Sequence, residues 1–312
     1  MIVRRVLGTT GRLLVLSGVL LLLFVAYQLW GTGFAEARSQ DRLRSEFERE
    51  IGTIPDIADF RPSQRLPSAT STTALAPPPP EGEAVAVLRI PKIGLDKTVV
   101  EGVGVPDLKK GPGHYPGTSM LGQAGNAGIA GHRTTYGAPF FEINELGPGD
   151  EIYVTTKQGS FLYEVTEQLI VSPDEIEVLH DKGDNRLTLT SCHPRYSARE
   201  RMIVVAALQG DPAPDDITQR LPPRSDGVPD ELPSEGDLPT EEVAAGAGLS
   251  GAGAGNGPAF LWGALALAVL VGEWAAARWW KKWPAYFLIT PVFLVVLFVF
   301  FEYVSVLLPA NV

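Results

Sequence analysis

The residue type best suited to covalent chemistry in this chain is its single cysteine. Cys192 is the only cysteine among 312 residues, so no disulfide can form within the chain. It follows the run 186–191 (Arg-Leu-Thr-Leu-Thr-Ser), whose composition is typical of a β-strand, and Pro194 ends that strand. Because a thiol at a strand end is open to a substrate, we interpret Cys192 as a nucleophile. The alternative is a small apolar side chain in the core.

Two other polar residues stand at the ends of predicted strands. His132 follows the small-residue run 128–131, and Arg201 opens the apolar run 202–205. A thiol, an imidazole and a guanidinium at three strand ends can act as nucleophile, general acid/base and oxyanion partner. The alternatives are a turn histidine at position 132 and a surface ion pair at position 201.

The histidines also raise the question of a metal site. Cys192, His193 and His132 lack the paired ligand spacing that zinc sites show, so neither a metal nor a cofactor is expected.

These residues lie in a segment, 84–209, that predicts a folded, mostly β domain. Its short β-branched runs, separated by Gly, Pro and Asp, are typical of a closed β-barrel with short helices. The predicted strands are Val85–Ile90, Lys97–Val103, Asn126–Gly131, Glu151–Thr156, Phe161–Leu169, Arg186–Thr190 and Met202–Leu208. Only Pro139–Leu146 predicts a clear helix.

Three apolar segments predict transmembrane helices around this domain. Residues 13–35 carry no charge and follow a basic cytoplasmic N-terminus, 1–12, so the rest of the chain is expected outside the cell. A cleaved signal peptide is the alternative, because Ala35-Glu36-Ala37 has the small-x-small form of a cleavage site. Segments 259–280 and 284–308 flank a basic, Trp-rich turn, which favours a multi-pass membrane protein with its β domain extracellular.

The remaining segments are expected to connect these parts. Segment 36–83 predicts a juxtamembrane helix, with Leu43, Phe47 and Ile51 on one face, followed by a Pro-rich spacer. Segment 210–258 is an acidic Gly/Pro-rich linker with ten Asp or Glu against two Arg. The net charge of −10 argues against nucleic acid as a partner.

At the residues that carry the chemistry, the chain resembles the sortases, cell-wall cysteine transpeptidases of Gram-positive bacteria. Thr188-Leu189-Thr190-Ser191-Cys192, with Arg201 nine residues later, is similar to the family signature Thr-Leu-x-Thr-Cys, although Ser191 replaces the usual Thr. Ala130-Gly131-His132 matches the upstream Ala-Gly-His. The resemblance covers residues 84–209 and implies the sortase barrel, with His132, Cys192 and Arg201 as catalytic residues.

Other motifs resemble sortase class E, and next to it class D, of high-GC Gram-positive bacteria (actinobacteria). These motifs are 111–118 (Gly-Pro-Gly-His-Tyr-Pro-Gly-Thr), Gly125-Asn126 and Gly131-His132-Arg133. The resemblance implies that Tyr115, Thr190 and Ser191 bind substrate, whereas the alternative for Tyr115 is a packing aromatic at the barrel edge.

The resemblance also implies a reaction. A secreted protein is cleaved at a C-terminal sorting signal of the LAxTG or LPxTG type, between Thr and Gly, and is joined to the amine of a peptidoglycan precursor of the lipid II type. Two alternatives remain open. The first is an L,D-transpeptidase-like wall cross-linking enzyme, although Ser191-Cys192-His193-Pro194 lacks the glycine of that family. The second is a catalytically silent membrane protein that only binds sorting signals.

Overall fold

The computed structural model describes residues 2–61, 79–213, 257–279 and 282–307. By its internal contacts the chain divides into two compact units, Met1–Phe34 with Gly253–Leu308, and Ala35–Ala252 with Pro309–Val312. Most of the predicted Pro-rich spacer and of the predicted acidic linker lies outside the described residues. Each unit is described by itself below.

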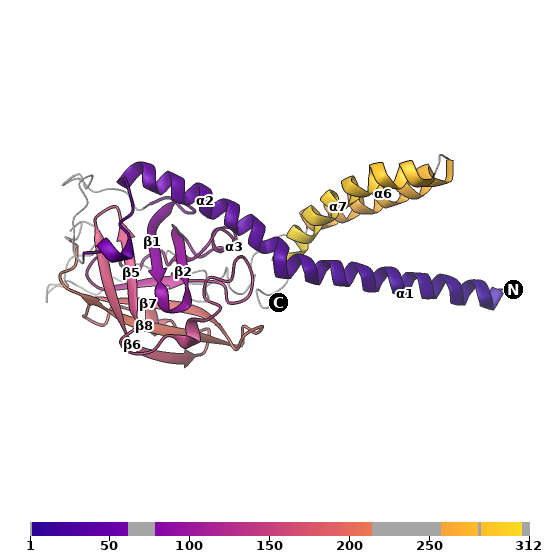
Figure 1. Ribbon diagram of the computed structural model, residues 1–312. Helices are drawn as coiled ribbons and strands as arrows, with labels where there is room; N and C mark the ends of the chain where they lie inside the picture. The colour runs from indigo at the N-terminus through magenta and orange to yellow at the C-terminus, as the bar shows by residue number, and fades with distance from the viewer. Residues whose placement is uncertain (1, 62–78, 214–256, 280–281, 308–312) are drawn as a thin grey trace, which may run out of the picture. The chain divides into compact units, whose positions relative to one another are not determined.

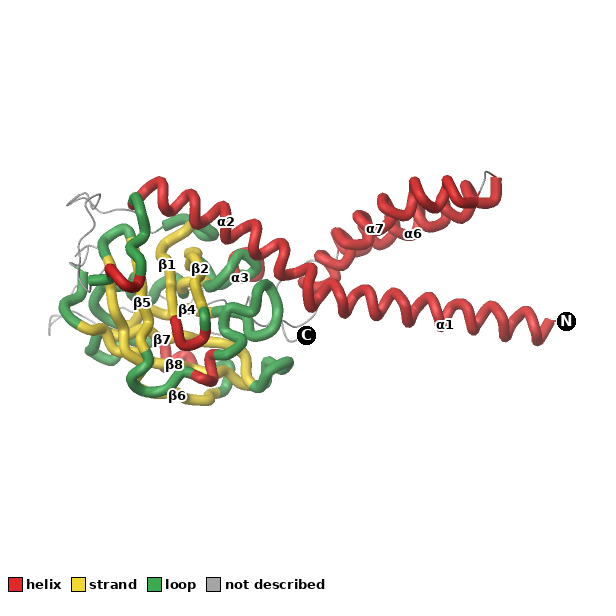
Figure 2. The backbone as a smooth tube through the Cα atoms, viewed as in Figure 1, coloured by secondary structure: helices red, strands yellow, loops and turns green. Residues whose placement is uncertain are grey.

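The second unit holds an eight-stranded closed β-barrel (Figures 1 and 2). The strands are β1 (Ala84–Ile90), β2 (Leu95–Glu101), β3 (Gly113–His114), β4 (Asn126–Ala130), β5 (Glu151–Thr156), β6 (Ser160–Val171), β7 (Arg186–His193) and β8 (Glu200–Gln209). Around the barrel their order is β1-β2-β3-β4-β7-β8-β6-β5. The β2–β3 and β4–β7 pairs are parallel, and the other pairs are antiparallel. The predicted mostly β fold and closed barrel are confirmed.

The short helical elements of this unit decorate the barrel. They are α3 (Val105–Leu108) and the 3₁₀ turns η2 (Ile57–Asp59), η3 (Pro91–Ile93), η4 (Ile143–Glu145) and η5 (Ile176–Leu179). The helix predicted over Pro139–Leu146 is wrong, because only the single 3₁₀ turn η4 forms there. Phe140 and Ile143 still reach the core, since the Ile143 amide bonds to the Phe140 carbonyl and this turn, which precedes η4, brings residues three apart to one face.

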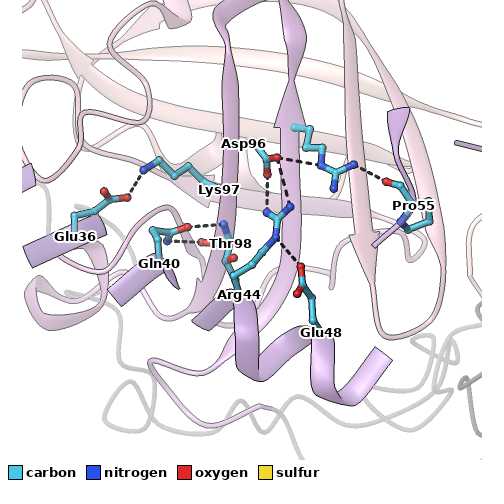
Figure 3. A network of polar contacts seen from close by, with 9 residues as sticks. Glu36, Gln40, Arg44, Glu48, Pro55, Asp96, Lys97 and Thr98 are labelled. Atoms are coloured by element: carbon cyan, nitrogen blue, oxygen red, sulfur yellow. Dashed lines mark hydrogen bonds and ion pairs between the residues drawn. The ribbon is translucent and has the colours of Figure 1, made fainter. Parts of the chain in front are cut away.

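Helix α2 (Thr32–Ile51) packs against β1 and β2. Apolar side chains near its C-terminus contact β1, and polar side chains along the helix contact β2. Phe47 and Ile51 are buried against Val87 of β1. The side chain of Gln40 behaves like a strand residue at the edge of β2. Its Oε1 accepts a hydrogen bond from the Thr98 amide at 2.7 Å, and its Nε2 donates to the Thr98 carbonyl at 3.0 Å (Figure 3).

Ion pairs flank this central amide. Lys97 Nζ lies 2.6 Å from Glu36 Oε1, and Arg44 Nη1 lies 2.6 Å from Asp96 Oδ1 (Figure 3).

The sequence pattern indicated the apolar face of this helix but not its partner. The compact unit that contains the barrel therefore begins at Ala35, upstream of residue 84, where the sequence placed the start of the folded domain.

The other unit consists of α1 (Ile2–Ala26), the π-helical turn η1 (Tyr27–Gly31), α6 (Gly257–Trp279) and α7 (Lys282–Leu307). The ring of Tyr27 packs edge-on against Phe298 of α7, with 5.0 Å between ring centroids. Between α6 and α7, Thr290 donates a hydrogen bond to Glu273 at 2.6 Å. Glu273 thus has a hydrogen-bond partner within the helical pair.

Across the described ranges, the structure offers no helix whose length and apolar character suffice to cross a membrane. The three predicted transmembrane helices stay predictions.

Candidate active site

The three predicted catalytic residues lie at the C-terminal ends of β4 and β7 and at the start of β8. Strand β4 runs parallel to β7 with Ala130 beside Thr190, and β7 runs antiparallel to β8 with Cys192 directly opposite Arg201. The Gly131 amide donates to the Thr190 carbonyl at 3.1 Å, so the β4–β7 register continues past the end of β4. Two residues beyond the Ala130–Thr190 pair, this register sets His132 beside Cys192.

Alternation along β7 decides which face carries the thiol. Leu187 and Leu189 point into the barrel core, so Thr188, Thr190 and Cys192 point to the opposite face. There Cys192 packs with Tyr115 and Ala130 in a separate small cluster. The candidate site therefore lies on the outer face of the barrel wall.

The Cys192 side chain is almost completely covered, with 2% of its surface exposed. This burial raises the pKa of the thiol, because a thiolate loses its hydration there, while the positive charges of Arg201 and Arg133 act in the opposite direction. The thiol is thus neutral at pH 7, with two guanidinium groups near enough to stabilise the thiolate when it forms.

His132 is equally buried, and within the described part of the chain its Nδ1 has no hydrogen-bond partner. Its ring lies 5.1 Å from the ring of Tyr136, centroid to centroid. Burial, and secondarily the charge of Lys109, lowers the pKa of His132 to about 4. The imidazole is therefore neutral at pH 7 and has a ring nitrogen free to exchange a proton.

Arg201 stands one residue inside β8 and is 6% exposed. Its Nη1 donates to the carbonyls of Ala198 at 3.1 Å and Glu200 at 3.2 Å, which fixes the guanidinium next to the β7–β8 turn. Because directly opposed residues of an antiparallel pair share a face, Arg201 and Cys192 point the same way. A fixed cation beside a nucleophile can stabilise a developing oxyanion.

The three predicted substrate-binding residues separate into two groups. Tyr115 and Thr190 share the face of Cys192, and the Tyr115 hydroxyl lies 3.0 Å from Thr190 Oγ1. Ser191 lies on the core face, where its hydroxyl donates to the Gly131 carbonyl at 2.8 Å. That bond links the end of β7 to the segment carrying His132, so the Ser191 hydroxyl is already used inside the protein.

A buried histidine–glutamate pair adjoins Tyr115 in the sequence. His114 of β3, next to Tyr115, contacts Glu101 of β2 with 2.8 Å between Nδ1 and Oε2. Its Nε2 lies 3.0 Å from the Ser119 carbonyl. Sequence reasoning gave His114 no role, since the two-residue strand β3 is too short to be recognised from periodicity.

His193 adjoins the nucleophile in sequence but not in orientation. It pairs with Glu200 in the β7–β8 ladder, so its side chain points to the face opposite Cys192. The structure therefore brings together Cys192, His132 and Arg201, and turns His193 away.

Sequence reasoning also gave no role to Arg133, the residue after His132. The residue is 3% exposed, and its guanidinium donates to the Cys192 carbonyl. The only sequence signal was its position within Gly131-His132-Arg133, because burial of an arginine cannot be predicted from its type.

Comparison with known proteins agrees with the motifs. The family described as "Sortase domain" matches residues 88–209. Sortase SrtE1 of Streptomyces coelicolor is 33% identical over 240 residues, which cover 72% of this chain and 60% of the relative. Sortase D of Bacillus subtilis is 35% identical over 119 residues, which cover 37% of this chain and 58% of the relative. The chain thus spans about 60% of the length of these curated relatives.

Solved structures with similar sequences include sortase E1 of Streptomyces coelicolor with a tripeptide in its active site. It is 35% identical, with a TM-score of 0.40, and the match covers 44% of this chain and 97% of that chain. Sortase E of Streptomyces avermitilis is 39% identical, with a TM-score of 0.39, and the match covers 42% of this chain and 91% of that chain. The predicted resemblance to classes E and D is confirmed, and this chain belongs to the sortase family, whose members are cysteine transpeptidases.

Proposed function

We propose that this chain is a sortase-type transpeptidase with Cys192 as its nucleophile. The observation that carries the proposal is the register of β4, β7 and β8, which brings a thiol, an imidazole and a guanidinium to one strand-end site. No other cysteine competes for the role, because Cys192 is the only one in the sequence. The substrates proposed are secreted proteins with a C-terminal sorting signal of the LAxTG or LPxTG type.

In the first half-reaction the Cys192 thiolate attacks the carbonyl carbon of the Thr–Gly bond. Arg201 stabilises the oxyanion that forms. The tetrahedral intermediate then breaks its carbon–nitrogen bond, and His132 gives a proton to the departing glycine amine. The product is a thioester between Cys192 and the threonine.

In the second half-reaction an amine of a peptidoglycan precursor of the lipid II type attacks the thioester. His132 takes the proton of the attacking amine, a new amide forms, and the Cys192 thiolate leaves. Water in place of the amine gives simple hydrolysis. The secreted substrate protein is thereby joined to the cell-wall precursor, and the enzyme returns to its starting state.

The protonation states of the two groups limit the rate. The raised pKa of Cys192 and the pKa of about 4 of His132 make the neutral pair dominant at pH 7. Only the minor thiolate–imidazolium form attacks, so turnover is expected to be slow until bound substrate alters the surroundings of the pair.

A peptide panel tests this function. Full-length protein in detergent is incubated with Leu-Ala-x-Thr-Gly and Leu-Pro-x-Thr-Gly peptides and an added amine, and products are identified by mass spectrometry. Cleavage between Thr and Gly, with transfer to the amine, is expected. A scrambled peptide and the Cys192→Ala variant are the controls. Cleavage by Cys192→Ala at the parent rate would refute the assignment.

We propose further that the chain is a multi-pass membrane protein with an extracellular barrel. This proposal rests on the amino-acid sequence, namely the uncharged run 13–35 after a basic N-terminus and the two apolar segments around a basic turn. Single cysteines introduced into the Cys192→Ala background test it. A probe near residue 230 should be labelled from outside, and one near Lys281 only after permeabilisation. Outside labelling near Lys281 would overturn this topology.

A further inference from the structure

Arg133 connects the segment after β4 to the backbone of the nucleophile. Its Nη1 donates to the Cys192 carbonyl at 3.1 Å, and its Nε donates to the Phe141 carbonyl at 2.8 Å. Its Nη2 donates to Asn144 Oδ1 at 2.6 Å. One guanidinium therefore holds the end of β7 and the turn 141–144 to the residue next to His132.

The charge of this guanidinium is not neutralised by an acid. In the described part of the chain its oxygen partners are two backbone carbonyls and one amide, and no carboxylate pairs with it. Burial of an unpaired charge is costly, so strong hydrogen bonds to all sides of the planar group must offset it. A lysine could not replace it, because an ammonium lacks the fork that reaches three separated oxygens.

A second guanidinium uses the same acceptors without reaching the nucleophile. Arg195 donates to the Phe141 carbonyl at 3.2 Å and to Asn144 Oδ1 at 3.1 Å, and it stacks 4.2 Å above the Phe141 ring centroid. It therefore provides a matched control, with the same charge and the same cluster but no bond to Cys192.

We propose that Arg133 is a positioning residue that holds Cys192 opposite His132 by binding the Cys192 carbonyl. The proposal rests on the proposed function, because it concerns the geometry of that reaction. Without the bond, the Cys192 backbone loses one of the contacts that fix it relative to the segment after β4, and a shift of about 1 Å between reacting groups can lower a rate by about 100-fold. The positive charge that Arg133 keeps near the sulfur also favours the thiolate.

The thiol gives a readout that does not depend on turnover. Cys192 is the only cysteine, and because it is almost completely covered, the absolute rate of its alkylation by iodoacetamide depends on access to the thiol, whereas the midpoint of that rate against pH reports its ionisation. The titratable or charged groups around it are Arg201, Arg133, Tyr115 and His132. Removing one positive charge from this set raises the thiol pKa and moves the alkylation midpoint to higher pH.

The experiment compares Arg133→Met, Arg133→Lys and Arg195→Met in full-length protein, with kcat and KM measured per folded molecule. Arg133→Met is expected to raise the alkylation midpoint and to lower kcat by about 10- to 100-fold with little change in KM. Arg133→Lys keeps the charge but loses the fork, so its midpoint should stay near that of the parent while kcat falls similarly. Arg195→Met should leave both measurements near those of the parent.

A further variant guards against a misfolded Arg133→Met. Asn144→Asp keeps an acceptor at the same place and adds a negative charge that pairs with Arg133, so its alkylation midpoint should also rise in a folded protein. An unchanged midpoint in Asn144→Asp and unchanged kcat in folded Arg133→Lys would overturn the proposal. Loss of kcat in Arg195→Met equal to that in Arg133→Met would also overturn it. If the parent cleaves no sorting peptide, the proposed function fails, whereas the alkylation profiles still test Arg133.

Discussion

Two polar clusters of the barrel unit differ in how their charges are compensated. Where α2 meets β2, Lys97 pairs with Glu36 and Arg44 pairs with Asp96 (Figure 3). At the ends of β4 and β7, Arg133 has no carboxylate partner among the described residues and donates to three neutral oxygens and to the sulfur of Met202. In the first cluster, each of these positive charges is neutralised by a carboxylate. The second retains positive charge beside a thiol that is neutral in the ground state and negative during the proposed reaction.

This difference predicts which measured property a substitution in each cluster should change. The exposed Arg44–Asp96 pair contributes little beyond holding two elements together, whereas Glu36 is buried and Lys97 offsets the cost of burying its charge. Uncompensated charge around a buried reacting group shifts the protonation equilibria of that group. Substitutions on α2 should therefore change stability, and substitution of Arg133, which binds the Cys192 carbonyl, should change rates and pH dependence.

The largest expected effect separates the two histidines near Cys192. His132→Ala should lower the rate of sorting-peptide cleavage by at least about 100-fold, the cost of losing a general acid/base. His193→Ala, whose side chain points to the opposite face, should cost much less. Steady-state cleavage assays of both variants, corrected for folded protein, check this. An inactive His193→Ala beside an active His132→Ala would reverse the assignment.

The next effect concerns Arg201. Arg201→Ala should lower the cleavage rate by about 100-fold or more, as removal of an oxyanion donor does. Arg199→Ala is the matched control, because Arg199 lies exposed two residues before Arg201. Equal rates for Arg201→Ala and Arg199→Ala would remove Arg201 from the mechanism.

A smaller effect is expected on α2, and it should appear in stability. Gln40→Ala leaves the buried amide and carbonyl of Thr98 without their side-chain partners, which should cost about 1–3 kcal/mol of unfolding free energy. Arg44→Ala removes a partly exposed ion pair and should cost about 0–1 kcal/mol. Denaturant titration measures both. If Arg44→Ala is the more damaging, the ion pairs rather than the amide hold α2.

The pH dependence of stability should show the burial of His132. Its folded-state pKa of about 4 lies below the ordinary 6.5, so the unfolded chain binds more protons between these values. The unfolding free energy should fall as pH drops from 6.5 towards 4, by at most about 1.4 kcal/mol per pH unit from this group. His132→Gln should lose this part of the slope and His193→Gln should keep it. Identical slopes in parent and His132→Gln would mean that the imidazole is not buried.

Much of the barrel could be predicted because its strands alternate visibly. The runs around Val87, Val154 and Val204 are β-branched and bounded by turn residues, which identifies strands without any tertiary information. The strand ends at His132, Cys192 and Arg201 followed from the same pattern. Strand β3 was missed, because its two residues carry no period and depend on β2 and β4 for pairing.

The contacts around the site could not be predicted in the same way. Leu43, Phe47 and Ile51 indicated an apolar helix face, but a helix face does not specify its partner, and α2 proved to pack on the barrel. The sequence indicated Arg133 only as part of a motif. Its burial depends on oxygen acceptors supplied by β7 and by the turn 141–144. Such contacts arise from three segments that the sequence does not show to be neighbours.

The central claim is that Cys192 carries the acyl group between the two half-reactions. Full-length protein is incubated with a Leu-Ala-x-Thr-Gly peptide without acceptor amine, and the intact mass of the chain is followed. The account predicts an added mass equal to the acyl group of the peptide fragment ending in Thr (the free fragment less one water), located on Cys192 and lost when an amine is added. Peptide cleavage that proceeds without such an adduct, or an adduct that persists in Cys192→Ala, would contradict it.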